Sequence, residues 1–204
     1  MNLVDQLQLE QYLPPNLSVE LTKYLQDKQV LLTISNKRKT KLGDYRLPNS
    51  KTPYHRVSVN GTLNQYAFLI TLIHEFSHLE AFEQFGKRIL PHGKEWKMIF
   101  GKWLKELISR NIFPEDISKP LAKYSINPKA SSVSDPQLMI GLRNYDVNRT
   151  IILNDLSDKA IFQIGKRIFE KGTKKRTRFL CKELNSSRLY LVSGLAEVSE
   201  INKL

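Results

Sequence analysis

The sequence predicts an α+β protein in which helices and a small antiparallel sheet come first and a small β-rich module follows. Short runs rich in β-branched residues lie among helical patterns in the first half of the chain. From about residue 149 the pattern changes to short strands separated by turn residues. The stretch between them is rich in proline and serine. We therefore predict a domain over 1–125, a linker or wrapping segment over 126–148 and a β-rich module over 149–204.

The first part of the chain alternates between helical and strand-like patterns. The predicted elements are helices at 3–12, 16–28, 62–86 and 92–110 and strands at 30–34, 42–47 and 55–59. Pro14 and Pro15 separate the first two helices. Thr62 and Gln65 fit a capping box at the start of the third helix, and Gly86 is a natural stop for it. This third helix is apolar around much of its girth, which predicts a central position.

The second part of the chain reads as a small β-meander or barrel. Short strand-like runs are predicted at 151–153, 160–164, 167–169, 176–184 and 188–192. Gly165, Gly172 and the serine-rich stretch 185–187 lie between them as turns. Between the two parts, Pro114, Pro120 and the patch 130–136 favour an irregular connection over 111–148.

Composition excludes several classes of protein. The chain has 204 residues, 41% of them hydrophobic and 25% charged, so it can bury a core. No apolar run reaches about 18 residues, and the start lacks a basic and then apolar signal, so neither a membrane span nor secretion is expected. Cys181 is the single cysteine, which excludes an internal disulfide and a structural zinc site built on several thiolates. A cytoplasmic location follows as the expectation.

The net charge of +12 is concentrated in two segments. Residues 37–61 contain seven basic and one acidic residue, and residues 149–204 contain twelve and six, so each segment has a net charge of +6. A basic surface attracts polyanions, of which nucleic acid is the commonest in a cytoplasm. Scattered, solvated lysines explain the same charge, and both interpretations stay open.

One basic run has the composition of a nucleic-acid contact. It consists of Lys174, Lys175, Arg176 and Arg178, with Phe169, Phe179 and Tyr190 nearby in the sequence. The cations would hold a nucleic-acid backbone and the aromatic rings would stack on bases. The alternative is an exposed β-hairpin whose lysines guard its edge.

Residues 74–78 form an H-E-x-x-H motif within the central predicted helix. His74 and His78 lie one above the other on a helix face, so two imidazoles can bind one ion. Glu75 is placed beside them to contact a water at the ion and to act as a general base. Zinc with three protein ligands keeps one position for that water. The structural alternative is a pair of helix histidines satisfied by hydrogen bonds.

A third ligand is needed, and His92 is the best placed candidate. The thirteen residues after His78 are enough to finish one helix, turn at Gly86 and return. Pro91 sets the entry to the next helix, and Gly93 allows close approach of the backbone. A histidine that caps this helix is the alternative. The rival carboxylates, interpreted as solvated or supporting groups, are Glu80, Glu83 and Glu95. His55, in the preceding strand, is left out of the ligand set.

The blocks 74–78, 85–88 and 91–96 resemble the SprT-like family of zinc metalloproteases, with H-E-x-x-H, F-G-K-R and P-H-G-K-E-W. That family includes bacterial SprT and the eukaryotic Spartan proteases, which cleave proteins crosslinked to DNA. The resemblance covers roughly 18–110. It implies a zincin-like domain in which one Zn²⁺ is held by His74, His78 and His92. It also implies Glu75 as the catalytic base, with Gly93 and Trp96 as support around the third ligand.

The chain departs from the family at its end. Many relatives carry a zinc ribbon with four cysteines, which Cys181 cannot form alone, so a second zinc is not expected. The β-pattern of 149–204 fits a ribbon that lost its metal or an unrelated module.

Zinc-dependent hydrolysis of peptide bonds, on proteins that include DNA-associated or DNA-crosslinked ones, is the function predicted from these residues. Substrate would add as an extra strand along an exposed sheet edge, for which the strand near Val57 is expected. Two alternatives stay open. One is a nucleic-acid-binding protein with a structural or weakly active zinc site. The other is a hydrolase for a small amide, which predicts a narrow pocket. The oligomeric state does not follow from the sequence.

Overall fold

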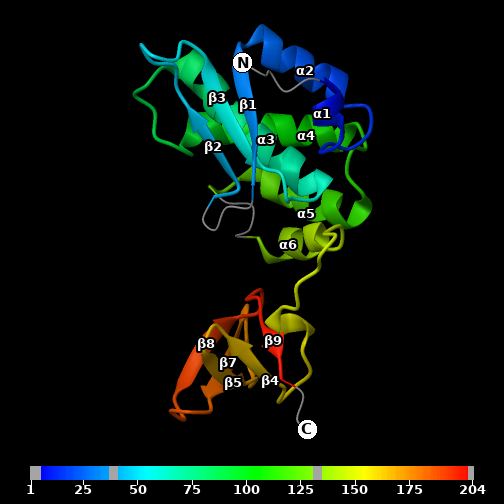
Figure 1. The fold of residues 1–204 in the computed structure, drawn as a ribbon, viewed down its shortest axis with the longest axis vertical. Helices are drawn as coiled ribbons and strands as arrows, with labels where there is room; N and C mark the ends of the chain where they lie inside the picture. Colours follow the sequence, from blue (N-terminus) through cyan, green and yellow to red (C-terminus); the bar gives the residue numbers. More distant parts are fainter. Residues whose placement is uncertain (1–5, 37–40, 131–134, 202–204) are drawn as a thin grey trace. The chain divides into compact units, whose positions relative to one another are not determined.

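The protein consists of two compact units, Met1–Val147 and Asn148–Leu204, each with its own hydrophobic core (Figure 1). The computed structural model describes residues 6–36, 41–130 and 135–201. Most of the basic connection around residues 37–40 and of the serine-rich patch at 131–134 lies outside the described residues. Within the described ranges, no helix is both long enough and apolar enough to cross a membrane.

The first unit has six helices and three strands in its described part. In chain order they are α1 (Gln6–Glu10), α2 (Ser18–Asp27), β1 (Val30–Ser35), β2 (Gly43–Arg46), β3 (His55–Asn60), α3 (Gln65–Phe85), α4 (Lys94–Ser109), α5 (Glu115–Ile126) and α6 (Pro136–Arg143). Every predicted helix and strand of residues 1–110 has a counterpart. The prediction of an α+β protein is confirmed.

Helices α5 and α6 occupy a stretch whose prolines predict an irregular connection, and this expectation is wrong for the described residues. Pro114 precedes the first turn of α5, where a missing N–H costs nothing. Pro120 lies inside α5, and its apolar ring is buried where α5 packs against α4 and α6. Burial of this face offsets the lost backbone hydrogen bond. The first unit therefore extends through α6, beyond residue 125.

The sheet of the first unit is mixed, not antiparallel as the sequence predicts. The strand order is β1-β3-β2, with β3 parallel to β1 and antiparallel to β2. A parallel neighbour requires a long connection, and residues 36–54, which include β2, provide it. The strand that contains Val57 is consequently the central one. Among the described strands, β2 pairs with β3 alone, so β2 is the edge strand on this side of the sheet.

Helix α3 starts at a different cap from the predicted one. The Asn64 side chain accepts hydrogen bonds from the backbone N–H groups of Tyr66 and Ala67, at 3.1 and 3.0 Å. The Thr62 hydroxyl instead donates to the side chain of Asn60. An asparagine directly before the first turn caps as well as threonine does, and here it lies closer to the orphan N–H groups.

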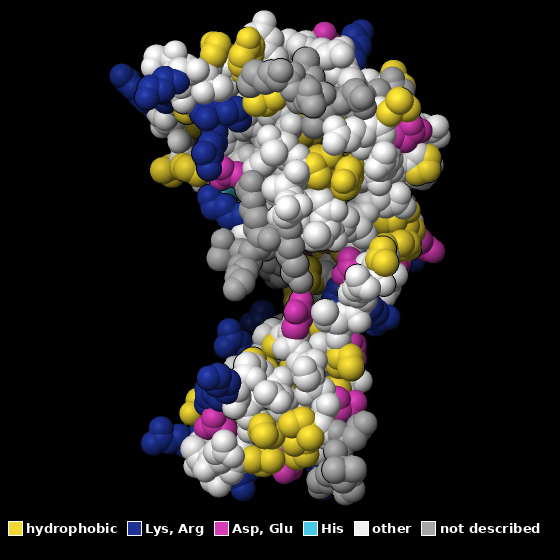
Figure 2. All heavy atoms as spheres, in the orientation of Figure 1, with side chains coloured by type: hydrophobic (Ala, Val, Ile, Leu, Met, Phe, Trp, Pro, Cys, Tyr) yellow, Lys and Arg dark blue, Asp and Glu magenta, His cyan; other side chains and the backbone are white. Residues whose placement is uncertain are grey.

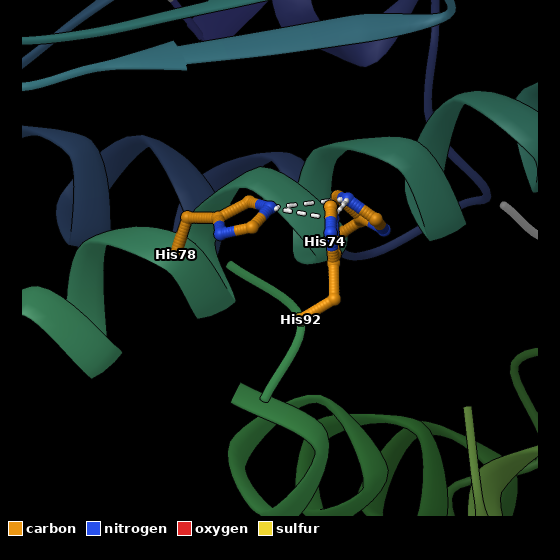
Figure 3. A group of neighbouring side chains, drawn as sticks. All are labelled: His74, His78 and His92. Carbon is orange, nitrogen blue, oxygen red and sulfur yellow. Dashed lines mark hydrogen bonds between the residues drawn. The ribbon is translucent and has the colours of Figure 1, made fainter. Parts of the chain in front are cut away.

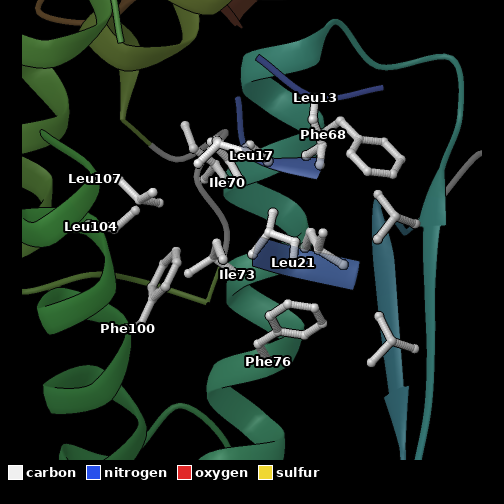
Figure 4. Close-up of a cluster of buried hydrophobic side chains, with 14 of the residues drawn as sticks. Leu13, Leu17, Leu21, Phe68, Ile70, Ile73, Phe76, Phe100, Leu104 and Leu107 are labelled. Carbon is white, nitrogen blue, oxygen red and sulfur yellow. The ribbon is translucent and has the colours of Figure 1, made fainter. Parts of the chain in front are cut away.

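Helix α3 lies between α4 on one side and the strands on the other (Figure 4). Both sides of α3 are therefore covered, as its apolar girth predicts. The buried side chains that surround it include Leu13, Leu17, Leu21, Phe100, Leu104 and Leu107, which pack on its own Phe68, Ile70, Ile73 and Phe76. This packing holds α3 rigidly, and with it the side chains at positions 74, 75 and 78.

The second unit is built on one sheet. Its elements are a short 3-10 helix, η2 (Leu153–Asp155), and the strands β4 (Ile161–Ile164), β5 (Arg167–Glu170), β6 (Lys174–Lys175), β7 (Arg178–Glu183), β8 (Leu189–Ser193) and β9 (Ser199–Glu200). The strand order is β6-β7-β5-β4-β9, and β8 pairs with β7. The strand predicted at 151–153 is reduced to a single antiparallel bridge between Ile152 and Glu197, because the chain enters η2 at Leu153, where the Asp155 side chain accepts from the Ile152 N–H.

Candidate metal centre

Three imidazoles meet at one point of the first unit. His74 and His78 project from α3, and His92 reaches them from the turn that precedes α4 (Figure 3). The Nε2 atom of His78 lies 3.3 Å from that of His74 and 3.0 Å from that of His92. The Nε2 atoms of His74 and His92 are 3.1 Å apart.

These distances fit a single tetrahedral ion. Zinc binds imidazole nitrogen at about 2.0–2.1 Å, so two nitrogens at the tetrahedral angle lie about 3.3–3.4 Å apart. The three nitrogen separations match this spacing within a few tenths of an ångström. In the described part of the chain, these histidines form the one group of three or more metal-ligating side chains close enough to share an ion. The donor set is suited to zinc.

The turn that carries His92 depends on the residues around it. His92 has a positive φ of 59°, and the N–H of Gly93 donates to the carbonyl of Leu90 at 2.9 Å. A Cβ at Gly93 would lie 2.9 Å from that carbonyl oxygen, so a glycine allows the turn to close. Trp96 is fully buried, and its ring lies 4.6 Å from the His92 ring and 4.7 Å from the His74 ring. Gly93 and Trp96 thus surround the imidazole that comes from outside α3.

Burial keeps the imidazoles neutral, which is the form that binds metal. Burial, followed by the proximity of the other two imidazoles, lowers the pKa of His74 to about 3. Burial and His92 lower the pKa of His78 to about 4, and burial also lowers the pKa of His92. Three neutral imidazoles leave their Nε2 lone pairs available to one cation.

Glu75 lies beside the three histidines and is itself 5% exposed. Burial, and then the negative charge of Asp44, raise the pKa of Glu75 to about 8, while Lys41 acts in the opposite direction. Although burial acts to raise it, hydrogen bonds from Arg46 and Lys41 hold the pKa of Asp44 below its ordinary value. A carboxyl group whose pKa lies this close to neutrality can both take up and release a proton there.

The edge strand β2 lies directly against the carboxylate of Glu75. A Cβ built on Gly43 would overlap Oε1 of Glu75 and lie 2.8 Å from Cγ2 of Thr71. Two residues further along β2, the ring of Tyr45 is parallel to that of His78, with centroids 6.3 Å apart. The alternation of a strand places Gly43 and Tyr45 on the face towards α3. The sequence predicted this strand but contained no signal for which of its faces meets the site.

Replacing Gly43 by alanine is expected to displace the Glu75 carboxylate. For the hydrolysis that the sequence predicts, with Glu75 as the general base, a misplacement of about 1 Å can cost about a hundredfold in rate, so a loss of that order in kcat is expected. Zinc content should stay unchanged. The control is Ser58→Ala on β3. Ser58 pairs with Asp44, so its side chain lies on the face of the sheet opposite to that of Gly43. Steady-state kinetics, beside the melting temperature of each variant, separate displacement from unfolding. Equal kcat for Gly43→Ala and the unchanged protein would contradict this reading of β2.

The rival ligands lie elsewhere. Glu80 accepts hydrogen bonds from the Tyr24 hydroxyl and from Nε1 of Trp103, both at 2.9 Å. Glu83 pairs with Lys28. His55 is not part of the histidine group, and its Nδ1 is hydrogen-bonded to the Tyr45 hydroxyl at 2.8 Å. Nor does Glu95 join that group.

The site opens into a cleft of about 760 Å³. One wall is a face of α3 from Thr71 to Phe82, and another is β2 with the residues that flank it. A helix rises 1.5 Å per residue, so this face is about 16 Å long, the length of about five residues of an extended peptide. His74, Glu75 and His78 lie in the middle of this face.

The cations of the second unit are exposed, as a polyanion contact requires. Lys174, Lys175, Arg176 and Arg178 lie on β6, on β7 and on the turn between them. Dark-blue Lys and Arg side chains are visible on both units in Figure 2. The stacking part of the hypothesis is wrong for Phe169 and Phe179, because both rings are buried in the second core. Arg167 lies over the ring of Tyr190.

Fold and site together define the first unit as an α+β domain in which two histidines of an H-E-x-x-H helix and a third from the turn before α4 could hold one metal ion. The family model described as the SprT-like family matches residues 13–111, and this part of the chain belongs to that family. The matched segment starts between α1 and α2, ends just after α4 and contains all three histidines. Comparisons with curated proteins and with solved structures gave no significant match.

Proposed function

We propose that the protein is a zinc-dependent metalloprotease that hydrolyses peptide bonds with an activated water. The observation that carries this proposal is the meeting of three imidazole nitrogens within 3.0–3.3 Å of one another, in an open cleft beside a buried glutamate. Zinc, when bound, would act as a Lewis acid that polarises the substrate carbonyl and lowers the pKa of a water. SprT-like membership of residues 13–111 supports the same chemistry.

The roles of the residues follow from their places in the cleft. His74, His78 and His92 would hold the ion through Nε2. Glu75, buried beside the three histidines, would accept the proton of the attacking water and pass it to the leaving nitrogen. Gly43 leaves room for this carboxylate. The buried Trp96 ring packs against the rings of His74 and His92 and restricts their movement.

An extended polypeptide is the substrate that the cleft fits best. The cleft is about 16 Å long by the helix rise, whereas a small amide would need only a narrow pocket. The edge strand β2 runs along the cleft, and its free edge can pair with a peptide main chain. Main-chain pairing selects unfolded or flexible segments. Because folded proteins hide their main chain, unfolded proteins should be the better substrates.

Substrates near nucleic acid are favoured by the charge of the chain. Residues 37–61, which contain β2, have a net charge of +6, and Lys41 and Lys87 line the cleft. We propose that these cations bring the protease to DNA-associated proteins, including crosslinked ones. Added single-stranded DNA should then increase the cleavage of a DNA-binding substrate, and this increase should disappear at high salt.

Removal and return of the metal tests the proposed function. The purified protein should hold about one zinc and should cleave unfolded casein. Phenanthroline should abolish the cleavage, and added zinc should restore it. Cleavage that survives complete chelation would contradict the proposal. A protein that holds zinc and binds nucleic acid, yet cleaves nothing, would favour the alternative of a nucleic-acid-binding protein with a structural zinc site.

A further inference from the structure

The cleft continues past the three imidazoles towards the carboxyl end of α3, where its walls become apolar. Five residues form this apolar bay: Tyr45, Leu47, Phe82, Ile89 and Leu90. Phe82 lies one helical turn after His78, on the same face of α3. The bay is therefore directly adjacent to the metal centre.

One wall of the bay is fixed by aromatic packing. The Tyr45 hydroxyl is hydrogen-bonded to Nδ1 of His55 at 2.8 Å, so its polar atom is already satisfied within the protein. The His55 ring in turn meets the Phe82 ring edge to face, with centroids 6.0 Å apart. The Tyr45 ring is also parallel to that of His78. Because these contacts hold Tyr45 and Phe82, the wall is formed before a substrate arrives.

Two further residues of the bay expose apolar surface to water. Leu90 is 75% exposed, and Ile89 is half-buried beside it. Leu90 begins the turn that carries His92, whose closure depends on Gly93, and Ile89 directly precedes that turn. An exposed leucine that lines the same cleft as these aromatic rings is stabilised when another apolar side chain covers it. Lys87 also lines the cleft, and no acidic side chain is among the five residues of the bay.

We propose that the apolar bay binds a large apolar side chain of the substrate, on the amino-terminal side of the scissile bond. The direction follows from β2, where Gly43 lies against Glu75 and Tyr45 lies beside His78. A peptide that pairs antiparallel with β2, as β3 does, runs from Tyr45 towards Gly43. The residues before the scissile bond then lie at the bay. This inference rests on the proposed function, since it assigns a subsite of that same cleft.

Cleavage-site mapping on unfolded protein substrates tests the proposal with the full chain. Products identified by mass spectrometry should show Leu, Ile, Met, Phe or Tyr in the two positions before the cut about tenfold more often than Ser or Asp. A hydrophobic pocket commonly discriminates by this amount. Leu90→Asp should lower that preference about fivefold or more, and Leu90→Met should keep it. Met98→Asp is the matched control, because Met98 is an exposed apolar residue on α4, 59% exposed and outside the cleft lining.

The outcomes separate this inference from the proposed function. If the zinc-loaded protein and its Glu75→Gln variant are equally inactive, the proposed function fails. If the protein cleaves but shows no apolar preference before the cut, the assignment of the bay is overturned. The same holds if Leu90→Asp and Met98→Asp alter the preference equally. A preference that falls after the cut would reverse the direction of the peptide and also overturn the proposal.

Discussion

Replacing Glu75 by glutamine is expected to lower kcat for peptide hydrolysis by about a hundredfold to ten-thousandfold, the range of a lost general base. Glutamine has almost the same shape as glutamate, so it fits the space beneath Gly43. Its amide cannot accept a proton from water at any pH near neutrality. The three imidazoles are untouched, and the variant should hold as much zinc as the unchanged protein.

Glu83→Gln is the matched control for this variant. Glu83 lies on the same helix but is exposed, forms an ion pair with Lys28 and does not line the cleft. Its replacement should change kcat by less than about twofold, since exposed ion pairs contribute little. Initial rates on unfolded casein, measured with zinc analysis of the same samples, decide the question. A Glu75→Gln variant that retains zinc and full activity would remove Glu75 from the mechanism.

Replacing His92 by asparagine is expected to weaken zinc binding by more than about a hundredfold. Loss of a group that hydrogen-bonds to a metal ligand already weakens metal binding about 10- to 100-fold, and loss of a ligand itself should weaken it more. Asparagine is chosen because it tolerates the positive φ of this position, so the turn before α4 should still form. The protein should then hold well below one equivalent of zinc after dialysis.

Thermal unfolding gives an independent measure of the same loss. Zinc at a hundred times its dissociation constant stabilises the native state by about 2.7 kcal/mol. The unchanged protein should therefore melt at a higher temperature with zinc than without it, and His92→Asn should lose most of this difference. The control is His55→Asn, which removes a nearby histidine outside the ligand group and should keep both zinc and the shift. Equal zinc contents for the two variants would exclude His92 as a ligand.

Local sequence patterns predicted those parts of the site that lie on a single element. The apolar periodicity predicted α3, and four-residue spacing on a helix places His74 and His78 on one face whatever the rest of the chain does. His92 followed from elimination and from its place before α4. The sequence predicts Thr62 as the cap of α3, whereas the structure has Asn64, two residues later. Threonine and asparagine are both good capping residues, and only the path of the backbone decides between them.

Packing between elements that are distant in the sequence overrides several local sequence patterns. Prolines at 114 and 120 predict a break, yet α5 forms because its apolar face is buried against α4 and α6. The sequence predicts the strand near Val57 as the edge beside the site, but β2 takes that place, since strand order depends on pairing partners that the sequence does not state. Phe169 and Phe179, which suit base stacking by composition, lie in the second core.

The sequence by itself therefore determined which side chains make up the candidate site: two histidines and a glutamate at helical spacing, and a third histidine beyond the next turn. Tertiary structure alone decided that the three nitrogens come within 3.3 Å of one another, that β2 forms the free edge beside them, and that Gly43 and Tyr45 line the cleft. The physical reason is that periodicity depends on neighbours within one element. Ligand distances, sheet order and cleft walls depend on how separate elements pack, and many packings share the same local pattern.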